Sequence, residues 1–310
     1  MASKRFRFKV WMRAMRAPFF QAVVVPTILG TVIAWYRSGI FYWQYFLLAT
    51  LAVVFINAGT NLANDYFDHQ SASDDINRDV TPFSGGSRVI QENLISPGKV
   101  HRSSLIFFGL AAVIGLYLTF VRGPVVLIIG ILGVLLGYFY TASPIKIGYR
   151  GWGEFVAGLN CGPLVVAGAY YVQAQTLSLE VLFISIPVGL LIAAILYINE
   201  FPDYACDRAA GKNTLIVKMG RERARKGFYS LLLSAYLFII LGAILRIFPW
   251  TVILSLLSFP LAWKTMKIAH SSYANTQGLI PAMSGTVTIH LSVGLLLSSG
   301  YVIARIFPWI

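Results

Sequence analysis

The chain has 310 residues, of which 57% are hydrophobic and only 12% are charged. Soluble domains average about 45–50% apolar and about 25% charged residues. This composition excludes a water-soluble globule, and the abundance of apolar surface excludes intrinsic disorder. The two cysteines, Cys161 and Cys206, are too few for a disulfide framework. We therefore expect an integral membrane protein.

Nine apolar segments approach the roughly 20 residues that a helix needs to cross a bilayer. They are 18–36, 42–63, 103–121, 124–141, 152–173, 180–199, 227–245, 249–266 and 279–303. The fourth and eighth are short, so a count of eight stays open. The sequence lacks the ten-residue stretches of alternating hydrophobicity that are typical of membrane β-barrels. The prediction is an all-α, polytopic membrane protein with nine transmembrane helices.

The formal net charge of +13 follows membrane topology and needs no nucleic-acid partner. Of the 25 Lys and Arg residues, 21 fall on the N-terminal tail and on every second connection, and 4 on the others. Cytoplasmic loops carry the excess of Lys and Arg. We therefore expect a protein of the cytoplasmic membrane with its N-terminus inside and its C-terminus outside. The basic tail is expected to remain as an anchor near anionic lipid.

Eight of the twelve acidic residues lie in two windows, which follow the second and the sixth apolar segment. These windows hold Asp65, Asp68, Asp74, Asp75 and Asp79, and then Glu200, Asp203 and Asp207. Each window has an Asn four residues before an Asp, as Asn61–Asp65 and Asn199–Asp203, and the two pairs are 138 residues apart. This spacing suggests one domain, 1–310, built from two related halves at about 1–141 and 152–303.

Carboxylates crowded on one helix face repel one another and need a cation. If the second segment continues as a helix, Asn61, Asp65 and Asp68 share a face. Oxygen ligands without His or Cys favour Mg²⁺ or Ca²⁺ over zinc. Mg²⁺ commonly completes its shell with water and substrate phosphates. The two windows together therefore favour a metal-bridged diphosphate site, although solvated loops or an ion pathway would also place acids near membrane segments.

Basic and small residues lie beside the acids on the same predicted face. Arg78 and Arg88 flank the stretch 82–87, whose Ser and Gly residues could present backbone N–H groups to an anion. The other cations on this face include Lys146, Arg150, Arg208 and Lys212. Each of them serves either the diphosphate or the topology.

These motifs resemble the UbiA superfamily of intramembrane prenyltransferases. The first acidic motif runs Asn61-Leu-Ala-Asn64-Asp65-Tyr-Phe-Asp68 and the second is Asn199-x3-Asp203-x3-Asp207, with the loop Tyr140…Pro144-x-Lys146 between them. Within the superfamily, the chain is most similar to the 1,4-dihydroxy-2-naphthoate prenyltransferases of menaquinone synthesis. The usual last Asp of the first motif would fall at Ala72, so Asp74 or Asp75 takes its place.

The resemblance implies nine helices around a central cavity and two Mg²⁺ ions holding an isoprenyl diphosphate. The metal ligands it implies are Asn64, Asp65, Asp68, Asp74, Asn199, Asp203 and Asp207. The diphosphate would be bound by Asn61, Asn64, Arg78, Arg88, Lys146, Arg150, Asn199 and Lys212. Asp68, Asp203 and Lys146 are expected to be catalytic, and the ring of Tyr140 or Tyr197 to stabilise an allylic cation.

Three alternatives remain open at this point. The acceptor is either aromatic, as in quinone synthesis, or a prenylated glycerol phosphate, as in archaeal-type lipid synthesis. A transporter would also have many spans, but its site would lie at mid-depth in the membrane rather than at one face. His290, inside the ninth segment, either contacts the acceptor or pairs with another helix. Prenyl chain length and oligomeric state stay undetermined.

Overall fold

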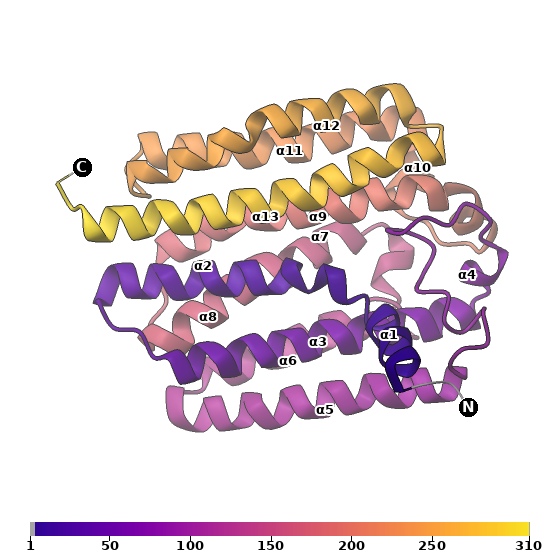
Figure 1. Cartoon of the computed structure of the whole chain (residues 1–310), viewed down its shortest axis with the longest axis horizontal. Helices are drawn as coiled ribbons and strands as arrows, with labels where there is room; N and C mark the ends of the chain where they lie inside the picture. The colour runs from indigo at the N-terminus through magenta and orange to yellow at the C-terminus, as the bar shows by residue number, and fades with distance from the viewer. Residues whose placement is uncertain (1–3, 310) are drawn as a thin grey trace.

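The computed structural model describes residues 4–309, and within that range all regular structure is helical. The long helices run side by side along the longest axis of the molecule (Figure 1). Eight helical segments of the described chain are long and apolar enough to cross a membrane. The remaining predicted span, the fourth one at 124–141, is a 14-residue apolar helix, α6 (Val125–Tyr138), about 21 Å long. The prediction of an all-α, polytopic membrane protein is therefore confirmed, with eight long helices and one short one.

The other spans of the described chain are formed by twelve further elements. They are η1 (Ala17–Phe20) leading into α2 (Gln21–Ser38), α3 (Trp43–Gln70), α5 (Pro97–Arg122), α7 (Gly153–Leu159) and α8 (Val165–Ala174) joined by the π-helical turn η3 (Asn160–Leu164), α9 (Leu179–Ala209), α11 (Arg221–Ile244), η4 (Trp250–Ser258) leading into α12 (Phe259–Ser272), and α13 (Thr276–Ile306). Four short helices complete the described chain: α1 (Lys4–Ala14), α4 (Ser73–Ile76), η2 (Ile147–Arg150) and α10 (Leu215–Met219).

Two helices extend well beyond their predicted spans. The apolar run of α3 was expected to end at 63, but the helix continues to Gln70. Likewise α9 continues past 199 to Ala209. Both acidic motifs are consequently helical. Their Asn and Asp side chains recur every three or four residues along one face of each helix.

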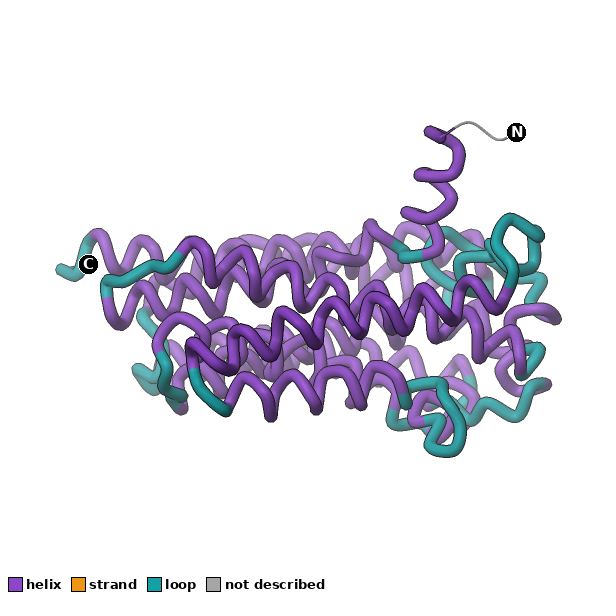
Figure 2. The backbone as a smooth tube through the Cα atoms, turned by 90° about the horizontal axis from the view of Figure 1, so that it is seen from below, coloured by secondary structure: helices purple, strands orange, loops and turns teal. Residues whose placement is uncertain are grey.

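The ends of α3 and α9 lie at the same end of the bundle, together with α4 and α10 (Figure 1). The C-terminus lies at the opposite end. Helix α1 projects from the bundle across the direction of the long helices (Figure 2). The main apolar core lies among α2, α9, α11 and α13. This packing fixes α9 firmly, so the second acidic motif is carried by a well-buried helix.

Candidate active site

A polar cavity of about 1290 Å³ lies between the two motif helices α3 and α9. Residues of both acidic motifs line it, although they are more than 130 positions apart in the sequence. Its polar lining comprises Arg16, Asn57, Thr60, Asn61, Asn64, Asp68, Asp74, Asn77, Tyr140, Asn160, Asn199, Glu200, Asp203, Asp207 and Lys212. The remaining wall is largely apolar and includes Phe19, Phe83, Ile192 and Leu196.

Asp68 is the most closely held carboxylate of the first motif. The hydroxyl of Tyr149 donates to its Oδ1 at 2.7 Å, and the amide of Asn64, one turn earlier on α3, donates to its Oδ2 at 3.2 Å. The Tyr149 hydroxyl also lies 2.6 Å from Ser71 Oγ. Burial raises the pKa of Tyr149, so the phenol keeps its proton and remains a donor. Two neutral donors, Tyr149 and Asn64, thus orient Asp68, in addition to the Lys212 ammonium described below.

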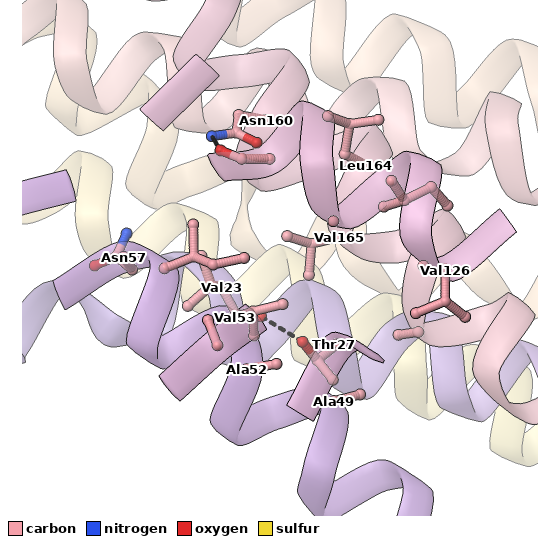
Figure 3. A pocket seen from close by; sticks show the side chains of 18 of the residues that line it. Val23, Thr27, Ala49, Ala52, Val53, Asn57, Val126, Asn160, Leu164 and Val165 are labelled. Carbon is pink, nitrogen blue, oxygen red and sulfur yellow. Dashed lines mark hydrogen bonds between the residues drawn. The ribbon is translucent and has the colours of Figure 1, made fainter. Parts of the chain in front are cut away.

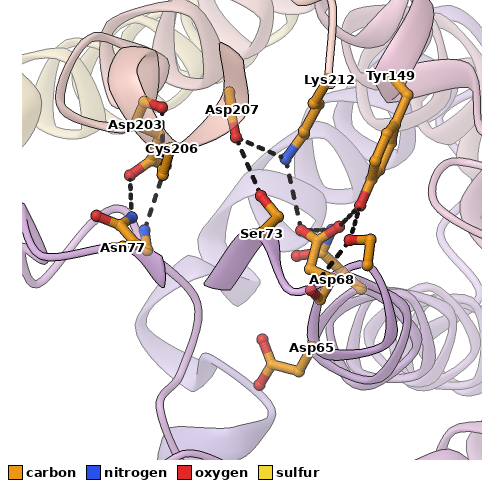
Figure 4. A network of polar contacts seen from close by, with 12 residues as sticks. Asp65, Asp68, Ser73, Asn77, Tyr149, Asp203, Cys206, Asp207 and Lys212 are labelled. Atoms are coloured by element: carbon orange, nitrogen blue, oxygen red, sulfur yellow. Dashed lines mark hydrogen bonds and ion pairs between the residues drawn. The ribbon is translucent and has the colours of Figure 1, made fainter. Parts of the chain in front are cut away.

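The second motif is held by the segment that follows α3. Asn77 donates to Asp203 Oδ1 at 2.7 Å, and the backbone N–H of Gly85 donates to Asp203 Oδ2 at 3.3 Å. Ser73 donates to Asp207 Oδ1 at 3.3 Å. These contacts, most of which can be followed in Figure 4, join the chain after the first motif to the second motif.

Lys212 bridges the two motifs. Its Nζ lies 3.5 Å from Asp68 Oδ2 and 3.6 Å from Asp207 Oδ1 (Figure 4). Burial alone would lower the pKa of Lys212, but the carboxylates of Asp68 and Asp207 outweigh it and hold the pKa well above its usual value. The ammonium group therefore stays charged at neutral pH, between the two acidic helices.

Asp65 points away from the cavity lining towards Arg16 and Ser87. Arg16 Nη2 donates to Asp65 Oδ1 at 2.7 Å and to Asn64 Oδ1 at 3.0 Å, while Ser87 donates to Asp65 through both its N–H and its hydroxyl. Burial lowers the pKa of Arg16, but the Asp65 carboxylate more than compensates and the pKa is raised overall. The carboxylate of Asp65 therefore fixes Arg16, which itself lines the cavity.

Asp74, rather than Asp75, faces the cavity. Asp74 is buried, and burial, together with the nearby Asp68 and Asp65 carboxylates, raises its pKa well above the usual value. Gly86, in a left-handed conformation with φ of +76°, packs against this carboxylate: an added Cβ would lie 2.2 Å from Asp74 Oδ2. Asp75 is exposed and pairs with His69 at 2.9 Å.

The donor set suits Mg²⁺. Asp207 Oδ2 and Asn199 Oδ1 are buried oxygens without a hydrogen-bond partner among the described residues. Nowhere in residues 4–309 do three His, Cys, Asp or Glu side chains stand close enough to hold a metal ion by themselves. Mg²⁺ typically uses one or two carboxylates and takes its other ligands from water and phosphate. The residues therefore fit a Mg²⁺ site that is completed by a substrate diphosphate.

Comparison with known proteins identifies the family. The model of the UbiA prenyltransferase family matches residues 23–279. The chain belongs to this family. A 2-carboxy-1,4-naphthoquinone phytyltransferase of Synechocystis sp. is 30% identical over 296 residues, which cover 94% of this chain and 93% of that protein. A 1,4-dihydroxy-2-naphthoate octaprenyltransferase of Bacillus subtilis is 28% identical and covers 91% and 89%.

The fold is likewise that of solved UbiA structures. A UbiA homolog from Archaeoglobus fulgidus, bound to DMAPP and Mg²⁺, superposes with a TM-score of 0.65 and 17% identity, covering 93% of this chain and 99% of that one. The chain is therefore a prenyltransferase, an enzyme that transfers alkyl groups other than methyl. It has the UbiA fold and is embedded in a membrane.

Several residues predicted to serve the UbiA site lie elsewhere in the structure. Arg78 and Arg150 are exposed, and Arg150 donates to the carbonyl of Pro144. Arg88 donates to the backbone carbonyl of Asp74 and so holds the loop rather than lining the cavity. Lys146, whose backbone φ is +46°, places its ammonium 5.1 Å from the Tyr149 ring centre. These four cations were expected at the diphosphate, but none of them lines the cavity in the structure.

Two further expectations are corrected by the geometry. Tyr197 is only 2% exposed and packs against Phe201 in the main core, so its ring does not line the cavity. The small residues at 82–87 were expected to offer N–H groups to an anion. Two of these groups, from Gly85 and Ser87, instead donate to Asp203 and Asp65. The stretch therefore fastens the motifs to each other.

Tyr140 does line the cavity. Its ring packs on Gly148 and Gly153, where an added Cβ would come within 2.9 Å and 2.7 Å of the phenol. His290 lies outside the cavity lining, with Nδ1 3.3 Å from Gln21 Oε1, so it pairs with another helix. Both residues are thus positioned by close helix or loop packing.

Little in the sequence pointed to Arg16, Asn77 or Tyr149 as cavity residues or their supports, or to the proximity of Glu200 and Glu154. Arg16 looked like a topology charge, but its left-handed backbone, at φ +51° between α1 and η1, brings it to the first motif. Asn77 and Tyr149 lie in connections and carry no motif. Glu200 lines the cavity beside the buried carboxyl of Glu154. The burial of these acids is visible only in the folded chain.

Proposed function

We propose that this prenyltransferase moves an isoprenyl group from a polyprenyl diphosphate to an aromatic acceptor of the naphthoate type. The observation that carries the proposal is the convergence of the two acidic motifs on one cavity, where Lys212 bridges them. Acids from α3 and α9 enclose a space with room for a metal-bound diphosphate. An apolar wall adjoins it, as a prenyl chain and an aromatic ring require.

Mg²⁺ would be held by Asn64, Asp68 and Asp74 on one side and by Asn199, Asp203 and Asp207 on the other, with Asp65 acting through Arg16. Two ions, one for each motif, fit this division. When bound, Mg²⁺ would neutralise the negative charge that develops on the leaving diphosphate. The cavity keeps these oxygens in place through Tyr149, Asn77 and Ser73.

The reaction begins with cleavage of the C1–O bond of the donor, which leaves both bonding electrons on the diphosphate and yields an allylic cation. Lys212 and Arg16 stabilise the departing charge. Asn199 provides an amide contact to the same group, whereas Asn61, whose amide already donates to the Met15 carbonyl and to Asn57 Oδ1, borders the space it occupies. The ring face of Tyr140 stabilises the allylic cation. An electron-rich carbon of the acceptor then forms the new C–C bond with C1, and the released diphosphate takes up the proton that this carbon loses.

The cations that line the cavity already pair with carboxylates, and this favours an aromatic acceptor over one that carries a phosphate. Among the described residues, the cavity is lined by the cations Arg16 and Lys212, and both already pair with carboxylates. A glycerol phosphate acceptor would bring a second anionic group that needs cations of its own. Phe19, Phe83 and Leu196 instead offer an apolar wall for a ring. The names of the similar proteins from Synechocystis and Bacillus subtilis also support a naphthoate-type acceptor.

The test is incubation of the purified protein with Mg²⁺, geranylgeranyl diphosphate and one of three acceptors: 1,4-dihydroxy-2-naphthoate, 4-hydroxybenzoate or geranylgeranylglyceryl phosphate. Mass spectrometry of the product identifies the acceptor. We expect the prenylated naphthoate to form, and Asp68→Ala to abolish it while the protein remains inserted and folded. Product with the glycerol phosphate alone would overturn the assignment.

The orientation proposed from charge places this site at the cytoplasmic face of the cytoplasmic membrane. The site end of the bundle carries the N-terminal helix and the connections rich in Lys and Arg, in keeping with the excess of positive charge inside. Single cysteines introduced at exposed Arg78 and at exposed Trp309 of a variant without native cysteines test this. A membrane-impermeant thiol reagent added to intact cells should label position 309 and spare position 78.

A further inference from the structure

Helix α1, at the start of the described chain, combines positive charge with exposed aromatic side chains. Five of its eleven residues are Lys or Arg, and none is acidic. Phe6 and Phe8 lie between these cations and are 49% and 65% exposed. A helix that is rich in Lys and Arg and also presents Phe is typical of one that lies in the headgroup region of a bilayer.

The side chains of α1 do not enclose the interior of the bundle. That interior holds the polar cavity of the active site and a second, apolar space of about 900 Å³ among α2, α3, α5, α6 and α8 (Figure 3). No residue between 4 and 14 lines either space. The exposed cations and rings of α1 are therefore available to a surface outside the bundle.

The direction of α1 places its outer half at the membrane surface. The helix projects from the end of the bundle that carries the acidic motifs, across the direction of the long helices (Figure 2). Because the long helices cross the bilayer, a helix directed across them runs along the membrane plane. Arg5, Arg7 and Lys9 are exposed on it, and no carboxylate within residues 4–309 forms an ion pair with them. These three cations therefore face the lipid headgroups.

The opposite end of α1 is fixed to the bundle. Arg13 forms a two-point ion pair with Glu92, at 2.8 Å and 2.5 Å. Trp11 and Met15 pack against a small buried core that includes Leu62 of α3. The helix is thus joined to the chain around the first acidic motif, while its outer half extends beyond the bundle.

The residues directly after α1 enter the active site. The carbonyl of Met15 accepts from the amide of Asn61 at 3.0 Å. Arg16, the next residue, donates to Asp65 at 2.7 Å and to Asn64 at 3.0 Å, and it lines the polar cavity. Any movement of α1 would displace this arginine, so the seat of α1 on its surroundings determines where Arg16 lies.

We propose that α1 is a docking surface for anionic phospholipid headgroups, and that binding to them holds Arg16 in the active site. Anionic headgroups supply the negative charge that Arg5, Arg7 and Lys9 do not receive from the described chain. Phe8 reaches the adjoining acyl region. The enzyme should therefore bind its isoprenyl diphosphate best when α1 is seated on an anionic bilayer. This inference holds for either class of acceptor.

The first measurement follows the seating of α1 directly. Phe8→Cys, in the full-length chain without native cysteines, carries a nitrobenzoxadiazole label whose emission rises in an apolar environment. The protein is reconstituted into nanodiscs of phosphatidylcholine, or of phosphatidylcholine and phosphatidylglycerol in equal parts. We expect emission about twofold higher in the anionic bilayer. About 1 M salt should remove the difference, because it screens exposed charges.

The second measurement links the seating to the site. In unlabelled enzyme with Arg5→Gln, Arg7→Gln and Lys9→Gln, KM for geranylgeranyl diphosphate in the anionic bilayer should rise about fivefold, with kcat within about twofold. The same changes in the labelled chain should remove the difference in emission between the two bilayers. Arg5→Lys with Arg7→Lys keeps the charge and should behave as the wild type in both measurements.

The matched control removes the same charge elsewhere. Lys99→Gln, Arg102→Gln and Lys226→Gln change exposed cations near the starts of α5 and α11. This control should keep both the lipid-dependent emission and the wild-type KM. A loss as large as that of the α1 variant would mean that overall surface charge, and not α1, is responsible, and would overturn the proposal.

Two further outcomes would contradict the inference. Equal emission of the labelled wild type in the two bilayers would overturn lipid recognition by α1. Lipid-dependent emission with an unchanged KM in the Gln variant would overturn the link to Arg16. Thiol labelling at positions 78 and 309 checks that the Gln variant keeps its orientation. If it does not, the salt dependence of wild-type emission is the test, and emission in the anionic bilayer that persists in about 1 M salt would refute charge recognition.

Discussion

The hydroxyl of Tyr149 offers the sharpest test of how the metal site is built. It donates to Asp68 Oδ1 at 2.7 Å and lies 2.6 Å from Ser71 Oγ. Tyr149→Phe removes these contacts and keeps the ring, which lies near the ammonium groups of Lys146 and Lys212 at 5.1 Å and 5.3 Å. The substitution thus isolates the support that one carboxylate receives from one phenol.

A hydrogen bond to a charged group contributes about 1.5–3 kcal/mol. If that energy orients Asp68 towards Mg²⁺, its loss should weaken apparent metal affinity about 10- to 100-fold, as for other groups that orient metal ligands. We therefore expect the Mg²⁺ concentration that gives half-maximal prenyl transfer to rise by this factor. Turnover at saturating Mg²⁺ should largely recover, because Asp68 itself is still present.

The assay is the initial rate of product formation as a function of free Mg²⁺. Tyr236→Phe is the control, because Tyr236 is also buried and its hydroxyl lies 2.8 Å from Ser258 Oγ, in a part of the bundle that does not line the cavity. It should leave the Mg²⁺ midpoint unchanged. If Tyr149→Phe lowers turnover without moving the midpoint, Tyr149 does not act through the metal and the reasoning fails.

Three other changes test separate parts of the site. Asp203→Ala should abolish transfer at saturating Mg²⁺, measured as prenylated product, and near-wild-type turnover would contradict the role of the second motif. Gly86→Ala places a Cβ 2.2 Å from Asp74 Oδ2 at a φ of +76°. The left-handed backbone alone should cost about 1–2 kcal/mol of folding stability. The displacement of Asp74 should in addition lower turnover at least tenfold. Gly220→Ala, at φ +77° with no atom within 4 Å, should show the backbone cost alone in its melting temperature. Finally, geranyl diphosphate should bind in calorimetry with Mg²⁺ present and not with EDTA, and equal affinity in both would refute a metal-dependent site.

The membrane-spanning helices were predictable because the bilayer permits few backbone conformations. Backbone N–H and C=O groups in the hydrocarbon region must form hydrogen bonds within a helix or a closed barrel. The length of an apolar run therefore suffices to indicate a span. The ends of α3 and α9 were not predictable in this way. Their last turns carry Asn and Asp and leave the apolar region, so hydropathy ends at 63 and 199 while the hydrogen-bonded helix continues to Gln70 and Ala209.

The acidic half of the site followed from spacing, whereas the loop residues did not. An Asn-x3-Asp pattern constrains the face of a helix, and Asn61, Asp68, Asn199 and Asp203 do line one cavity. A cation in a loop has no such constraint. Lys146 adopts a positive φ that no residue pattern specified, and its side chain lies at the Tyr149 ring rather than in the cavity lining. The two-halves interpretation stays a prediction, although both motifs lie at the C-terminal ends of long helices.

The charge of the cavity explains why metal and diphosphate should enter together. Its described lining holds five acids, Asp68, Asp74, Glu200, Asp203 and Asp207, against the cations Arg16 and Lys212. The raised pKa of Asp74, which burial and the neighbouring carboxylates cause, shows that a further negative charge is already unfavourable there. A bare diphosphate would meet the same repulsion, whereas one that carries Mg²⁺ brings the charge the acids lack. The donors Tyr149, Asn77 and Ser73 carry no charge, so they hold the carboxylates in place without neutralising the negative charge that binds the metal.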